Sequence, residues 1–174
     1  MPIEPPIFDC LTHPALDGGW VHPRWAGGNT FQSLRGELAA ANSPWAFAVT
    51  MGADAGWELE KYVQACTQPG PKLFPVAWCD PAVPPDFAAV QAMGYCGIKM
   101  HPRLGGFEVS DPRLPDLIQA AHAVGLISFL CTWPPRDANA LPGGLPALER
   151  LLNDTSGCRK ILLHTGGPRL KEVA

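Results

Sequence analysis

Hydrophobic residues along the chain follow two alternating spacings. Short apolar runs, most of them ended by a proline or a glycine-rich loop, have the period of two that is typical of β-strands. Between these runs, apolar residues recur every three or four positions, as on one face of an amphipathic helix. The runs predict strands at 7–13, 45–50, 73–79, 95–101, 127–133 and 160–165, with helices that carry Phe31, Leu59, Phe87, Leu114 and Leu145, and a further helix beginning in 168–174.

This regular alternation predicts an α/β protein. Strands that alternate with helices form parallel sheets, because a helical crossover returns the chain to the same end of the sheet. The first strand is followed by Leu-Thr-His-Pro and not by the glycine fingerprint of a dinucleotide-binding turn. No linker, repeat or low-complexity segment interrupts the pattern, so we expect one domain over residues 1–174.

Composition narrows the class of protein. The 174 residues are 47% hydrophobic and 17% charged with a net charge of −3, and they contain no basic run, which argues against nucleic acid as a partner. No apolar stretch reaches the roughly 20 residues that cross a bilayer, and the first residues lack the features of a signal peptide. We therefore expect a cytoplasmic protein without a membrane partner. Its six cysteines, with no C-x-x-C pair among them, should be reduced.

The stretch Tyr95–Phe107 holds the strongest chemical signal. Lys99 and His101 are two positions apart and so point to the same face of a strand, which Pro102 ends. We expect His101 to be the last strand residue, with the loop from Arg103 beginning beside it. Titratable side chains at the carboxyl end of a parallel strand are where α/β barrels hold their active sites. The alternative is an edge lysine extended to solvent beside a surface histidine.

The same pattern recurs at other predicted strand ends. In a barrel, these ends would converge on one rim, which predicts a functional site there. His22 lies in the first loop after a strand and either covers this site or is an exposed loop residue. His122 lies beside the apolar stripe of a helix and is expected to face solvent. The rim residues are Asp9, Leu11 and His13 from strand one, Cys131 and Trp133 from strand five, and His164 from strand six.

Four segments, in this order and spacing, resemble the amidohydrolase superfamily, and in particular its branch of metal-dependent hydrolases, lactonases and aromatic-acid decarboxylases. The segments are FDCLTH (8–13), GIKMHPRLGGF (97–107), FLCTW (129–133) and ILLHTGG (161–167), and LFPVAWCDP (73–81) is similar to the family's third strand. The resemblance implies a TIM-type (β/α)₈ barrel with a divalent metal, commonly zinc, at the carboxyl ends of its strands.

The chain departs from the family pattern at several ligand positions. The family motif Asp-x-His-x-His has Leu11 at its first histidine, so that only His13 is kept, and Cys131 replaces the usual strand-five histidine. His164 is retained, whereas the strand-eight aspartate would lie beyond Ala174. About six βα units are present where the fold has eight over about 250 residues. We therefore expect a C-terminally incomplete barrel. Either the chain is a fragment of a longer protein with unpaired edges at strands one and six, or another copy or a second chain pairs with these edges.

Three functions remain open. The first is a hydrolase of a small, anionic amide, ester or lactone, with His13, Cys131 and His164 around a weakly bound zinc that activates water. The second is a metal-free lactonase or a relative of the aromatic-acid decarboxylases. In that enzyme His164 would be the general base, and Lys99, His101 and Arg103 would hold an anionic substrate. His101 and His164 are the expected catalytic residues. The third is a degenerate barrel or fragment that only binds. The residues expected to bind substrate are Lys99, Arg103, His22 and Trp133.

Overall fold

The computed structural model describes residues 5–19, 28–50, 58–132 and 144–164, and all structural statements below refer to these residues. The chain divides into two compact units. The first comprises Met1–Ala77 with Met93–Tyr95, and the second Trp78–Ala92 with Cys96–Ala174. Within the described residues, no helix is both long and apolar enough to cross a membrane.

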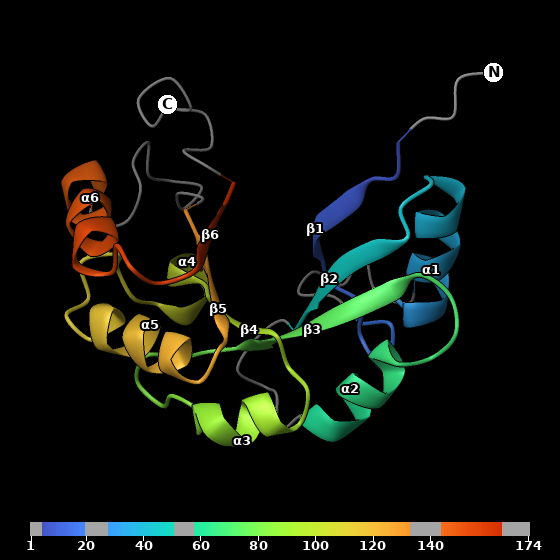
Figure 1. Cartoon of the computed structure of the whole chain (residues 1–174), viewed down its shortest axis with the longest axis horizontal. Helices are drawn as coiled ribbons and strands as arrows, with labels where there is room; N and C mark the ends of the chain where they lie inside the picture. The colour runs from blue at the N-terminus through green and yellow to red at the C-terminus, as the bar shows by residue number, and fades with distance from the viewer. Residues whose placement is uncertain (1–4, 20–27, 51–57, 133–143, 165–174) are drawn as a thin grey trace. The chain divides into compact units, whose positions relative to one another are not determined.

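The first unit alternates strands and helices, and its strands β1, β2 and β3 pair in parallel (Figure 1). Helices α1 and α2 cover one face of these strands, where Ala46 and Ala48 are completely buried. A capping box begins α1, because Thr30 Oγ1 accepts from the Ser33 amide and Ser33 Oγ accepts from the Thr30 amide. The elements are β1 (Phe8–Thr12), α1 (Phe31–Ala40), β2 (Trp45–Val49), α2 (Leu59–Cys66) and β3 (Lys72–Trp78).

Contacts between the two helices fix this layer. The ring of Phe31 on α1 meets Tyr62 on α2 edge to face at 4.9 Å. Arg35 extends from α1 and donates from Nη2 to the carbonyl oxygens of Ala65 and Cys66, at 2.8 and 3.0 Å. These carbonyls belong to the last turn of α2, which has no intrahelical donor for them. One side chain therefore both joins the helices and ends α2.

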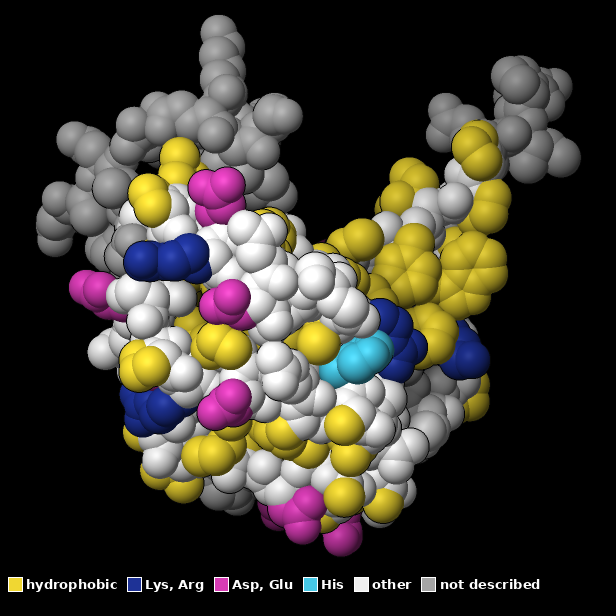
Figure 2. Space-filling view, turned by 60° about the vertical axis from the view of Figure 1, so that its left-hand side comes forward, with side chains coloured by type: hydrophobic (Ala, Val, Ile, Leu, Met, Phe, Trp, Pro, Cys, Tyr) yellow, Lys and Arg dark blue, Asp and Glu magenta, His cyan; other side chains and the backbone are white. Residues whose placement is uncertain are grey.

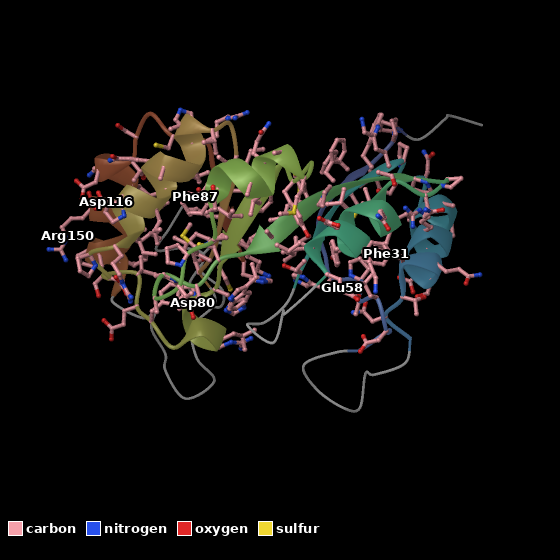
Figure 3. The ribbon with its side chains drawn as sticks, turned by 90° about the horizontal axis from the view of Figure 1, so that it is seen from below. Phe31, Glu58, Asp80, Phe87, Asp116 and Arg150 are labelled. Atoms are coloured by element: carbon pink, nitrogen blue, oxygen red, sulfur yellow. The ribbon has the colours of Figure 1, made fainter. Side chains whose placement is uncertain are left out.

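The second unit repeats the pattern. β4, β5 and β6 pair in parallel, with Lys99 aligned to Phe129 and Phe129 aligned to Ile161. Helices α5 and α6 cover one face through buried residues such as Ile118 and Leu148. Asp116 of α5 and Arg150 of α6 are on these helices in Figure 3. The elements are α3 (Phe87–Ala92), β4 (Gly97–Met100), α4 (Pro102–Gly105), α5 (Leu114–Ala123), β5 (Ile127–Cys131), α6 (Gly144–Asp154) and β6 (Lys160–Leu163).

The strand order equals the chain order, β1-β2-β3-β4-β5-β6, and this confirms the predicted parallel α/β architecture with six strands. The predictions for the ends of the chain, including a helix in 168–174, lie outside the described residues, as do His22 and Trp133. That residues 1–174 form one domain stays a prediction.

Two local predictions were wrong at helix starts. β4 ends at Met100, and His101 is instead the N-cap of the short helix α4, which the sequence analysis took for a loop. The helix expected to begin at Asp111 and Pro112 begins at Leu114. Asp111 Oδ1 accepts the amide of Arg113 at 3.0 Å, which closes a local turn that competes with the helix. Both errors arise from side chains that bond nearby backbone.

A substitution at Gly97 tests the packing of the second unit. A Cβ atom there would lie 2.5 Å from the carbonyl oxygen of Ile127 and 2.7 Å from Cε2 of Phe129. We expect Gly97→Ala to lower the free energy of unfolding by about 1–3 kcal/mol, measured by urea denaturation, because the core is overpacked. Gly36→Ala is the matched control. It has open space around its Cβ, and removal of a mid-helix glycine should be neutral or stabilising. Equal stability of the two variants would contradict this packing.

Candidate functional site

The junction of β4 and α4 fixes both the burial and the hydrogen bonding of a histidine. His101 is 3% exposed, and its Nδ1 accepts the amide of Leu104 at 3.3 Å. Pro102 occupies the first helical turn, where its missing amide costs no hydrogen bond, and Gly106 ends α4 with φ of 68°. A ring nitrogen that accepts a hydrogen bond carries no proton, so the proton of the neutral ring is on Nε2. His101 is thus a hydrogen-bond donor through Nε2.

Burial and nearby cations keep this imidazole neutral. Desolvation, followed by the positive charges of Lys99 and Arg103, lowers the pKa of His101 from 6.5 to about 4. Trp78, the last residue of β3, stacks on the ring with centroids 6.0 Å apart and planes 21° from parallel. Phe107 and Trp78 both border Gly105, where an added Cβ would lie 2.6 Å from the Phe107 ring. Aromatic packing therefore fixes the orientation of His101.

Lys99 lies two residues before His101 and is 1% exposed. Desolvation is the main cause that lowers its pKa from 10.5 to about 8, and Arg103 lowers it further, whereas Cys131 raises it. The amine is still mainly protonated at pH 7. A buried ammonium group is costly unless hydrogen bonds or opposite charge compensate it.

Two other strand ends contribute to the same group. Cys131 is the last residue of β5 and is 1% exposed. His164 directly follows β6 on the surface, with φ of 61°, a left-handed conformation that strains a non-glycine residue. Desolvation first, and then Lys99 and Arg103, lower the pKa of His164. The structure therefore brings together Lys99, His101, Arg103, Cys131 and His164 at the carboxyl ends of β4, β5 and β6.

His13 belongs to the first unit, and its position relative to this group is not defined. It is half-buried, and its Nδ1 donates to the carbonyl oxygen of Val49 at 3.1 Å. Leu11 is half-buried on β1, where the family motif has a histidine. His122, expected to face solvent, is half-buried, and its Nδ1 accepts the Arg159 amide at 3.4 Å.

The described residues do not by themselves fit a metal ion. No three histidine, cysteine, aspartate or glutamate side chains among them form a group that could hold one. Within the second unit, Nδ1 of His101 is already bonded to backbone. A zinc site made of His13, Cys131 and His164 would need both units, so that ligand set stays a prediction.

Solved structures of other proteins resemble this chain. A protein described as a 2-pyrone-4,6-dicarboxylic acid hydrolase, from Acinetobacter baumannii with citric acid bound, matches 89% of this chain and 56% of its own, with a TM-score of 0.56 and 18% identity. The apo IDCase of Metarhizium anisopliae matches 94% of this chain and 66% of its own, with a TM-score of 0.68 and 12% identity. No family model and no curated protein matches the sequence.

The chain has a parallel α/β fold that matches both solved structures over most of its length. Both solved structures are members of the amidohydrolase superfamily, in agreement with the resemblance in the sequence. The chain spans little more than half of the first structure and just under two thirds of the second. At these identities the likeness concerns the fold, and the site must be argued from its own residues.

Two residues of this site, Trp78 and Thr132, carry no chemical signal that the sequence alone reveals. Trp78, which stacks on His101, was not selected although it precedes Cys79-Asp80-Pro81 at a strand end. Thr132 donates from Oγ1 to the carbonyl oxygen of Leu163 at 2.8 Å and so joins the ends of β5 and β6. Their positions directly at strand ends were the available signal, but neither residue type is titratable.

The neutrality of His101 can be tested through stability. Between about pH 4 and 6.5 the unfolded chain binds a proton at this residue that the folded chain does not. The free energy of unfolding should therefore fall as pH falls through this window, by at most about 3 kcal/mol. Urea denaturation across the window should show a shallower pH dependence for His101→Gln. The same pH dependence in both proteins would contradict the burial of a neutral His101.

Proposed function

We propose that the chain contributes to hydrolysis of a small substrate that carries a carboxylate next to an ester, lactone or amide carbonyl. The observation that supports this most is a neutral histidine donor beside two cations. Lys99 and Arg103 supply positive charge, and His101 supplies an Nε2–H that does not lose its role at neutral pH.

Each residue has a role that follows from its surroundings. Arg103 is exposed and near the buried Lys99. Its guanidinium would bind the substrate carboxylate through two hydrogen bonds, and the ammonium group of Lys99 would add positive charge. His101 would donate to the carbonyl oxygen as negative charge develops on it. His164 is exposed, and its lowered pKa leaves the imidazole free of a proton at pH 7, as a general base requires. It would take the proton of the attacking water.

The solved structures of the same fold support an acidic substrate. One is named for a dicarboxylic acid and contains citric acid. The other is a decarboxylase, and this favours a second candidate in which the same cations hold the carboxylate that leaves as carbon dioxide. In the decarboxylation, His101 would donate to the group that receives the electron pair of the broken carbon–carbon bond.

Kinetics of point variants test these roles. 2-Pyrone-4,6-dicarboxylate is the probe, followed by loss of its ultraviolet absorbance and by release of carbon dioxide. We expect His164→Gln to lower kcat by about 10²- to 10⁴-fold, because a general base is lost. His122→Gln, on α5 in the same unit, should leave kcat unchanged. A His164→Gln protein as active as the wild type would overturn the role of His164, and carbon dioxide release without ring opening would favour decarboxylation.

The metal is a separate prediction. We expect at most weak, zinc-selective binding, because Leu11 replaces one usual ligand and thiolate and imidazole donors select zinc over magnesium or manganese. Dialysis against zinc followed by elemental analysis should find bound zinc in the wild type and a loss of at least about tenfold in affinity in Cys131→Ser. If neither protein retains zinc, the site of His13, Cys131 and His164 is wrong.

A further inference from the structure

The backbone of His164 is strained in a way that its proposed role does not by itself explain. Its φ of 61° lies in the left-handed region, which a residue with a Cβ atom enters at a steric cost. Among the described residues other than glycine, Asn42 is the second with a positive φ, and asparagine tolerates this conformation well. A strained residue keeps its conformation only when the surrounding structure holds it, and such residues are frequent at functional sites.

Thr132 holds the carbonyl group that directly precedes His164. Its backbone amide donates to the carbonyl oxygen of Leu163 at 3.1 Å, and its Oγ1 donates to the same oxygen at 2.8 Å. The amide bond continues the ladder between β5 and β6 one residue beyond the aligned pair of Cys131 and Leu163. The hydroxyl bond is an addition that the ladder does not require. A carbonyl oxygen has two lone pairs, and Thr132 supplies a donor for each of them.

These two hydrogen bonds oppose relaxation of the strained backbone. With the flanking chain in place, a return of His164 to a negative φ would rotate the peptide plane between Leu163 and His164, because that plane is rigid. The rotation would turn the Leu163 carbonyl oxygen away from Thr132. The side chain of Thr132 is 1% exposed, so its hydroxyl would then be buried without this acceptor, which is unfavourable.

The conformation held in this way determines where the imidazole lies. A change of φ moves the Cβ atom relative to the preceding peptide plane, so relaxation would displace the whole side chain of His164. Besides desolvation, the charges of Lys99 and Arg103 lower the pKa of His164, so both cations lie near the ring as it stands. The strained backbone therefore keeps the ring beside the cations that would bind the substrate carboxylate.

We propose that Thr132 is a positioning residue for His164. Its two donors hold the Leu163 carbonyl oxygen and so maintain the left-handed backbone that presents the imidazole of His164 to the substrate. Thr132 itself is buried and does not contact the reacting atoms. What the imidazole does there rests on the proposed function, whereas the restraint on its backbone is independent of it.

A double-mutant cycle tests the restraint without any substrate. Glycine adopts a positive φ without steric cost, so His164→Gly relieves the strain wherever the backbone is held in that conformation. Thr132→Val removes the hydroxyl at nearly constant volume, after which the backbone of His164 can relax. We expect His164→Gly to raise the folding equilibrium constant, from urea denaturation, about 3- to 10-fold more in the wild type than in Thr132→Val. An equal effect in both backgrounds would overturn the proposal.

Thr155→Val is the matched control for the loss of a buried hydroxyl. Thr155 is also 1% exposed, and its amide and Oγ1 donate to one carbonyl oxygen, that of Leu151, at 3.1 and 2.6 Å. Leu151 lies within α6, on the helical side of the second unit, where Figure 2 shows positive and negative side chains interspersed. Thr155→Val should therefore leave the effect of His164→Gly as it is in the wild type.

Kinetics test what the restraint is for. With 2-pyrone-4,6-dicarboxylate, we expect Thr132→Val to lower kcat by about 10- to 100-fold and to leave KM within about twofold, because the base is displaced and the binding groups are not. Thr132→Ser keeps the hydroxyl and should restore kcat to within about threefold, and Thr155→Val should leave kcat unchanged. Wild-type kcat in Thr132→Val, in a protein that needs His164, would overturn the positioning role. If the wild type does not act on this substrate, the proposed function fails for it, and the cycle alone decides whether Thr132 positions His164.

Discussion

The hydrogen bond from the Leu104 amide to Nδ1 of His101 determines the chemistry of this site. It exists because the chain turns directly from β4 into α4, so that the side chain of the residue between them caps the helix. The bond fixes the tautomer, and burial with two nearby cations keeps the ring neutral. A histidine at a strand end, which could serve as base or ligand, is thereby restricted to donating through Nε2.

Positive charge at the ends of β4 to β6 carries a desolvation cost. Lys99 is buried and its pKa is lowered to about 8, which is the expected effect of desolvation on an ammonium group. The strained backbone of His164 adds to this cost. Both features are typical of sites that are kept for function at the expense of stability.

The strand edges impose the second constraint on the molecule. A parallel sheet made of βα units needs another strand at each end or a closed barrel, because unpaired backbone groups beside apolar side chains attract another chain.

The sequence by itself determined the order of strands and helices, because the spacing of apolar residues within each segment is a local property of that segment. All six strands are found where the pattern placed them, and the fold class inferred from motifs such as 97–107 agrees with the solved structures. The tertiary structure decided the rest. It made His101 a helix cap and a neutral donor, placed Trp78 against it, and moved the start of α5 from Asp111 to Leu114. Tautomer, pKa and ring stacking depend on which groups meet in space, and no local spacing encodes that.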